Sequence, residues 1–131
     1  MTKSNHIYTL RNAMGNAYAP YSNYHVGALI VSDKGNQYIG CNVENASYPQ
    51  GQCAESGAIA AMVVAGDKQI QHIYIMSDDK EGATPCGGCR QRIREFSNSK
   101  TLISLCSSEE IIKTMGISDL LPHSFGPEHL A

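Results

Sequence analysis

The segment CAESGAIAAMVVAG, residues 53–66, is rich in Ala, Ile, Met and Val and closes on a glycine, which predicts a buried helix over Cys53–Ala65. An apolar, β-branched run follows at Ile70–Met76 and is typical of an interior strand. A second helix is predicted over Cys86–Phe96, and a further strand over Thr101–Cys106. Strands that alternate with helices in this way favour a mixed sheet with helices packed on its faces.

The residues on either side of these elements complete the predicted sheet. Asp33–Asn36 has the composition of a hairpin turn and lies between two β-like runs. Upstream, the predictions are a helix with apolar residues at Ile7, Leu10, Met14 and Ala17 that stops at Pro20, strands at Tyr24–Ser32 and Gln37–Val43, and an irregular stretch over Asn45–Gln52. Downstream, they are a short strand near Ile111–Met115 and a helical turn at Ser118–Leu121. No repeat or linker is visible, so a single domain over residues 1–131 is expected.

The composition is that of a globular domain with few charges. Of 131 residues, 42% are hydrophobic and 17% are charged, and the formal net charge is −2. Proteins that bind a phosphate backbone usually carry a stripe of Lys and Arg, and its absence here disfavours a nucleic-acid partner. The low charge content hints at surface buried between identical subunits.

The sequence shows neither a membrane span nor an export signal. No apolar run approaches the roughly 18 residues that a membrane span needs, and residues 1–5 lack the apolar centre of a signal peptide. A cytoplasmic location is therefore expected, where thiols stay reduced. Five cysteines are an odd number, which also disfavours a complete disulfide framework. Cys41 and Cys106 lie in predicted strands and are expected to be buried core residues.

The other three cysteines lie at predicted helix starts. Cys53 is two residues before Glu55, and Cys86 and Cys89 enclose two glycines after Pro85. Unpaired N–H groups and the helix dipole at such a start both favour the thiolate, the form that binds metal. If the two helix starts face each other, the three sulfurs can hold one zinc ion and leave a fourth position open to water. Glu55 would then serve as general base and, once protonated, as general acid.

Two other interpretations of these cysteines stay open at this point. A C-x-x-C motif in a cytosolic α/β protein can be a redox dithiol, which would bind no zinc. A structural zinc site needs a fourth ligand, which Cys41, Cys106 or one of the five histidines could supply.

C-A-E followed by P-C-x-x-C resembles the signature of the zinc nucleobase deaminases, in the variant with Cys in place of His. Further stretches resemble the small homotetrameric cytidine deaminases and come in the same order along the chain. They are APYS at 19–22, HVGA at 25–28, GCNVENASYP at 40–49, DLLP at 119–122 and SFGP at 124–127. The similarity runs from about Tyr18 to Leu130, nearly the whole chain.

This resemblance implies a three-layer α/β/α sandwich around a five-stranded mixed sheet, and a homotetramer with active sites shared between subunits. It also implies one Zn²⁺ per subunit and hydrolytic deamination of cytidine and deoxycytidine, with ammonia release, in pyrimidine salvage. The implied substrate contacts are Asn42 and Glu44 at the ribose 3′-hydroxyl, Tyr24 on the pyrimidine face where the family usually has Phe, the Ala54 backbone N–H at the base carbonyl, and Tyr48 and Phe125 contributed by neighbouring subunits.

One position departs from the family pattern. The family commonly follows C-A-E with an Arg that bonds to the cysteine thiolates, and here Ser56 stands in its place. Three thiolates on a dication leave a net negative centre, and a serine donates only one neutral hydrogen bond. We therefore expect either a compensating donor, with Arg90 the nearest in sequence, or a more alkaline pH–rate profile. The departure keeps open a related deaminase acting on a blasticidin-like compound, a free base or a modified nucleoside. The alternative from another class is a non-catalytic zinc module.

Overall fold

The structure is a computed structural model that describes residues 3–130. Its centre is one five-stranded sheet in the order β2-β1-β3-β4-β5. The strands are β1 (Val26–Ser32), β2 (Gln37–Cys41), β3 (Ile70–Ser77), β4 (Leu102–Cys106) and β5 (Ile111–Gly116). β3 and β4 pair in parallel and all other neighbours are antiparallel, so the sheet is mixed, as predicted.

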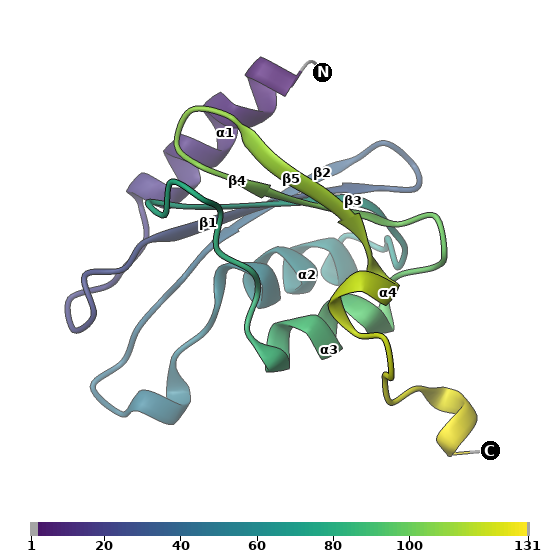
Figure 1. The fold of residues 1–131 in the computed structure, drawn as a ribbon. Coiled ribbons are helices and arrows are strands. Elements are labelled where there is room, and N and C mark those ends of the chain that lie inside the picture. Colours follow the sequence, from purple (N-terminus) through teal and green to yellow (C-terminus); the bar gives the residue numbers. More distant parts are fainter. Residues whose placement is uncertain (1–2, 131) are drawn as a thin grey trace.

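Helices cover both faces of this sheet (Figure 1). α1 (Lys3–Gly15) lies on one face, and α2 (Ala54–Val64) and α3 (Gly87–Glu95) lie on the other. The short helix α4 (Ile117–Leu120) follows β5, and 3₁₀ turns occupy Tyr48–Gln50 and Pro127–His129. The arrangement confirms the predicted three-layer α/β/α sandwich. In the part of the chain that the structure describes, no helix has the length and apolar character to cross a membrane.

Each face of the sheet has its own apolar core, because successive residues of a strand point to opposite sides. On the face of α2 and α3, Ile30, Ile73 and Ile93 pack together and are fully buried. On the face of α1, Leu10 and Leu29 pack together and are also fully buried. Burial on both faces explains why β1 and β3 read as nearly continuous apolar runs rather than as alternating ones.

Two glycines allow helices to approach the sheet closely. A Cβ atom at Gly40 in β2 would lie 2.4 Å from the carbonyl oxygen of Ala54 and 2.6 Å from the nitrogen of Ala58. A Cβ atom at Gly27 in β1 would lie 2.8 Å from the carbonyl oxygen of Leu10. The two glycines therefore let the backbones of α2 and α1 lie directly against the sheet.

The first predicted helix is shorter than expected. α1 ends at Gly15, so the prediction that it continues through Ala17 to Pro20 is wrong. The chain leaves the helix at Gly15 and Asn16, both poor helix formers, and Tyr18 instead forms an isolated bridge with Val43.

Two strands also begin or end inside their predicted bounds. β1 begins at Val26 rather than at Tyr24, because side chains and not a neighbouring strand satisfy the backbone of Tyr24: its N–H donates to the Ser22 hydroxyl at 3.0 Å and its carbonyl oxygen accepts from the Asn42 amide at 2.8 Å. β2 ends at Cys41, and Val43 makes only isolated bridges. Since β2 is an edge strand, Cys41 is only half-buried, and its assignment to the core is wrong; Cys106 is fully buried, as expected.

Candidate active site

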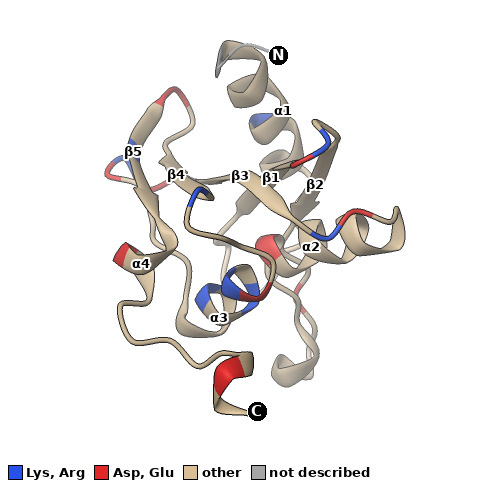
Figure 2. Ribbon diagram, turned by 90° about the vertical axis from the view of Figure 1, so that its right-hand side faces the viewer, with Lys and Arg blue, Asp and Glu red and all other residues tan. Residues whose placement is uncertain are grey.

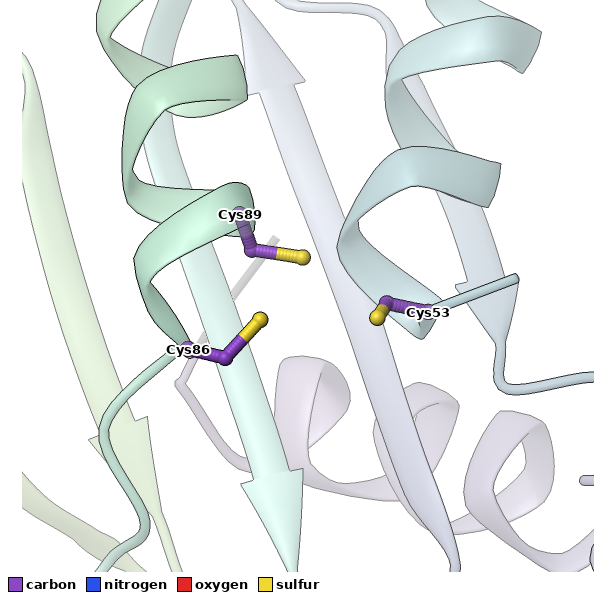
Figure 3. Close-up of side chains that lie close together, drawn as sticks. All are labelled: Cys53, Cys86 and Cys89. Atoms are coloured by element: carbon purple, nitrogen blue, oxygen red, sulfur yellow. The ribbon is translucent and has the colours of Figure 1, made fainter. Parts of the chain in front are cut away.

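The starts of α2 and α3 bring three cysteine side chains together. Cys53 is the N-cap of α2 and Cys86 is the N-cap of α3, and both have extended backbone conformations. Cys89 follows in the first turn of α3. The three sulfur atoms point into the space between the two helix starts (Figure 3) and lie within 4.8 Å of one another. The predicted convergence of the two helix starts is confirmed.

The donor set fits a zinc ion. Tetrahedral zinc with Zn–S bonds of about 2.3 Å places its sulfur ligands about 3.8 Å apart, so only a small contraction of this cluster is needed. Thiolates are soft ligands that select zinc over magnesium or calcium. Within residues 3–130, the cluster contains these three cysteines and no fourth His, Cys, Asp or Glu. Three ligands are typical of a catalytic zinc site rather than a closed structural one.

The pKa values of the three thiols depend on their burial and on the helix start. The backbone N–H of Cys89 is directed at the Cys86 sulfur and holds the pKa of that thiol below its ordinary value. Burial raises the pKa of Cys53 and of Cys89. The expected effect of a helix start therefore holds at Cys86, whereas burial outweighs it at the other two. A buried thiolate is costly without a cation nearby, which agrees with a metal site.

Glu55 lies beside this cluster in the first turn of α2. Its side chain is only 5% exposed, and its carboxylate is within hydrogen-bonding reach of Cys89. Burial raises the pKa of Glu55, and the positive charge of Arg92 partly opposes that effect. A raised pKa makes the Glu55 carboxylate a better proton acceptor, which suits it to general acid–base catalysis.

A pocket of about 410 Å³ opens above Glu55 and contains most of the predicted site. The predicted residues in its lining are Tyr24, Asn42, Glu44, Tyr48, Cys53, Ala54, Glu55 and Cys86. Cys89 is fully buried next to the pocket. Phe125 lies elsewhere, in the C-terminal segment, where it is 54% exposed and its ring stacks on His129 with centroids 5.1 Å apart.

Sequence reasoning missed some of the pocket walls. Val26 and Ile75 line it from β1 and β3, and Thr84 lines it from the loop before α3. An apolar residue inside a strand gives no signal that it faces a ligand, so the first two could not be found from the sequence. Thr84 is next to Pro85, and its proximity to the P-C-x-x-C motif was a usable signal.

Asn42 and Glu44 brace the loop that carries Tyr24. The Asn42 amide accepts a hydrogen bond from the N–H of Val26 at 2.9 Å and donates one to the carbonyl oxygen of Tyr24 at 2.8 Å. The Glu44 carboxylate accepts from the N–H groups of Tyr21 and Ser22, at 3.0 and 3.1 Å, and from the Ser22 hydroxyl. These bonds, that of the Ser22 hydroxyl above all, keep the pKa of Glu44 below its ordinary value.

Neither Ser56 nor Arg90 is directed at the thiolates. The Ser56 hydroxyl donates to the Cys53 carbonyl oxygen at 2.9 Å. The Arg90 guanidinium donates to the carbonyl oxygens of Pro85 and Leu120, at 2.8 and 2.9 Å. The hypothesis that Arg90 compensates for the serine is therefore wrong, because its donors hold the loop before α3 and the end of α4.

Comparison with known proteins agrees with this geometry. Residues 1–105 match the family model of the cytidine and deoxycytidylate deaminase zinc-binding region. A cytidine deaminase of Mycoplasma genitalium is 35% identical over 120 residues, which cover 91% of this chain and 92% of the relative. One of Sporosarcina psychrophila is 35% identical over 121 residues, covering 92% and 89%.

Solved structures show the same similarity in three dimensions. The crystal structure of cytidine deaminase from Burkholderia pseudomallei superposes with a TM-score of 0.88 at 35% identity, covering 95% of this chain and all of that one. The one from Mycobacterium tuberculosis gives a TM-score of 0.78 at 34% identity, covering 91% and 96%.

The sandwich fold and the three-sulfur centre beside a buried carboxylate define the class of zinc-dependent deaminases. Within that class, the extent of the match shows that this chain belongs to the cytidine and deoxycytidylate deaminase family.

Proposed function

We propose that this chain hydrolyses the 4-amino group of cytidine and deoxycytidine, giving uridine or deoxyuridine and ammonia. The observation that carries the proposal is the position of Glu55. Its buried carboxyl group lies between the three-cysteine cluster and a pocket of about 410 Å³, so a planar base in that pocket would meet both. The relatives that share this fold are named cytidine deaminases, which supports the choice of base.

The pocket lining offers a contact for each part of a nucleoside. Asn42 and Glu44 line this pocket, which supports assigning them to the ribose 3′-hydroxyl, and a site built to hydrogen-bond a hydroxyl rejects analogues that lack it. The Tyr24 ring is half-exposed at the same pocket and can stack on the pyrimidine. Ala54 is the first residue of α2, so its N–H has no partner within the helix and can donate to the base carbonyl.

Glu55 performs the proton transfers. Zinc bound by Cys53, Cys86 and Cys89 supplies a Lewis acid that makes water acidic enough to react at neutral pH. Glu55 takes one proton from the water that adds to C4 and delivers it to N3. It then takes the second proton from the new hydroxyl group and delivers it to the amino nitrogen. The C4–N bond breaks, ammonia leaves, and Glu55 returns to its starting state.

We further infer that residues 1–131 act as one deaminase domain within a homotetramer, in the cytoplasm and in pyrimidine salvage. Exposed aromatic side chains support the assembly: Tyr48 is 77% exposed, and Tyr18, Tyr21 and Phe125 are more than half exposed. Tyr48 lies at the rim of this chain's own pocket, from which it can also reach a neighbour. Phe125 lies outside that pocket, as expected of a residue that completes the site of another subunit.

The direct test is the ultraviolet change when cytidine is mixed with purified, zinc-loaded protein, together with measurement of released ammonia. Deoxycytidine, cytosine, a modified cytosine nucleoside and blasticidin S serve as competing substrates. We expect turnover of cytidine and deoxycytidine and little turnover of free cytosine, because the base alone has no ribose to contact Asn42 and Glu44. If only another amino-heterocycle releases ammonia, the proposed substrate is wrong; if none does, so is the proposed activity.

A further inference from the structure

The three-cysteine cluster places several negative groups together. Three thiolates on a dication leave one net negative charge, and the Glu55 carboxylate adds another close by. Such a centre needs a positive group near it, since uncompensated charge in a partly buried site is costly. Ser56 carries no charge, and the Nε and Nη1 atoms of Arg90 donate to the carbonyl oxygens of Pro85 and Leu120 rather than to a cysteine sulfur.

Arg92 is placed to supply it. It lies three residues after Cys89 and four after Gly88, so it shares their side of α3. Long side chains on a helix point back toward its N-terminus, here toward the two α3 cysteines. The Nη1 atom of Arg92 lies 3.1 Å from where a Cβ of residue 88 would be. The guanidinium thus rests against Gly88, between Cys86 and Cys89 in the sequence.

The same guanidinium faces the serine across a hollow. A cavity of about 330 Å³ beside the metal cluster is lined by Cys53, Ser56, Arg92 and the segment 49–52. Within the described lining of this hollow and of the substrate pocket, Arg92 is the only Lys or Arg. Figure 2 shows basic residues gathered on α3, next to the acidic start of α2. The small Ser56 side chain leaves the hollow open to a guanidinium that comes from α3.

We propose that Arg92 is a positioning residue for the metal site: its guanidinium offsets the charge of the three thiolates from the α3 side of the hollow beside Ser56. The inference rests on the proposed function only for its effect on turnover, because its effect on zinc retention needs no substrate. It predicts that Arg92 raises zinc affinity and kcat while leaving KM for cytidine nearly unchanged.

The test compares zinc retention in five proteins: the wild type, Arg92→Gln, Arg92→Lys, Arg11→Gln and the double variant Ser56→Arg/Arg92→Gln. Each is loaded with zinc and challenged with a chromophoric chelator. Residues that support metal ligands typically contribute 10- to 100-fold in affinity; for the exposed Arg92 we expect Arg92→Gln to lose about tenfold, the low end of that range. Arg11 lies on α1, on the other face of the sheet from the cysteine cluster. Arg11→Gln therefore removes the same charge at a distant position and should behave as wild type.

Rescue separates charge compensation from simple damage to α3. Arg92→Lys keeps the charge without the planar donors and should retain more zinc than Arg92→Gln. The double variant supplies a guanidinium from the other side of the hollow and should recover most of the loss. Because Arg92 is exposed, the difference between wild type and Arg92→Gln should shrink in 1 M salt.

Several results would overturn the proposal. Arg92→Gln could retain zinc as wild type does, or the Lys and double variants could be as poor as Arg92→Gln. Arg92→Met repeats the comparison with an apolar neutral side chain if the Gln variant folds badly, as judged by circular dichroism. If zinc retention follows the prediction while cytidine releases no ammonia in any variant, Arg92 has the proposed role and the proposed function fails.

Discussion

The side-chain amide of Asn42 donates a hydrogen bond to the carbonyl oxygen of Tyr24 at 2.8 Å and so links the end of β2 to the loop before β1. A residue proposed to bind the ribose is therefore also the one that holds the aromatic side chain proposed to stack on the base. Substrate binding and loop order are coupled through this contact, and one substitution should disturb both.

Asn42→Ala should lower kcat/KM for cytidine by about 10- to 100-fold, since leaving polar partners unpaired costs roughly 1–3 kcal/mol. Most of the loss should appear in KM, because Asn42 lies away from the proton transfers. Asn16→Ala removes the same amide from an exposed position after α1 and serves as the control. Steady-state kinetics with cytidine measure the effect, and an unchanged KM would exclude Asn42 from the substrate site.

Glu55→Gln should abolish most turnover while leaving zinc in place. The amide is nearly isosteric with the carboxylate but cannot accept a proton, and proton transfer by a positioned group contributes about 10²–10⁴-fold. We expect kcat to fall by about 10³-fold, with a zinc content equal to that of the wild type in metal analysis. Turnover at the wild-type rate would rule out Glu55 as the group that moves the protons.

Gly40→Ala should destabilise the fold through the backbone of α2. A Cβ atom there would lie 2.4 Å from the Ala54 carbonyl oxygen, so β2 and α2 must move apart. Overpacking of this kind costs about 1–3 kcal/mol of unfolding free energy. Gly15→Ala is the matched control, since a Cβ atom at Gly15 meets nothing within 4 Å. Urea denaturation measures the stability of both variants. Equal urea midpoints for Gly40→Ala and Gly15→Ala would show that α2 can shift away from β2 without cost.

The elements that could be predicted from the sequence are those with a strong local signal. β3 is a β-branched run, and α2 starts beside C-A-E; both were predicted to within one or two residues. The three-cysteine site followed because helix starts and a metal ligand set carry their own chemistry. By contrast, Gly15 and Asn16 weakly signal the end of α1, but the bridge that Tyr18 then makes with Val43 is a tertiary contact with no local trace.

The arginines on α3 were misjudged for a different reason, which is the geometry of the helix itself. Arg90 is adjacent to Cys89 in sequence, yet α3 turns its guanidinium toward Pro85 and Leu120. Arg92, two residues later, comes back to the side of the cluster. Neighbours on a helix surface are three or four residues apart, so proximity along the chain was the wrong guide.

Asp67→Asn should weaken the fold at neutral pH and lose that effect in acid. The buried Asp67 carboxylate accepts hydrogen bonds from Asn36, Tyr38 and Ser32, at 2.9, 2.7 and 2.7 Å. These hydrogen bonds lower the pKa of Asp67 from an ordinary value of 3.8 to about 2, and the bond from Asn36 has the largest effect. Because the pKa of Asp67 is lower in the folded state than in the unfolded state, ionisation of Asp67 stabilises the fold at any pH above the unfolded-state pKa. This stabilisation is lost as the pH falls toward the folded-state pKa.

The difference in urea midpoint between wild type and Asp67→Asn should therefore be constant above about pH 5 and narrow between about pH 4 and 2. Asp33→Asn removes the same charge from an exposed position in the β1–β2 hairpin, to which Asp67 binds, and corrects for the general effect of acid. A difference that does not narrow over this range would mean that the ionised carboxylate is not what stabilises the hairpin.

Two inactive variants should complement each other if subunits share active sites. Phe125→Ala removes a side chain that lies outside this chain's own pocket, and Glu55→Gln removes the proton carrier inside it. In a mixed assembly, some pockets keep Glu55 from one chain and receive Phe125 from the other, and those pockets are complete. Co-expression of the two variants should restore cytidine turnover well above the sum of the separate variants, and light scattering should give a tetramer mass. Turnover equal to the sum of the separate variants would mean that Phe125 acts within its own chain or has no part in the site. Only exchange between subunits can bring an intact Glu55 and an intact Phe125 into the same pocket.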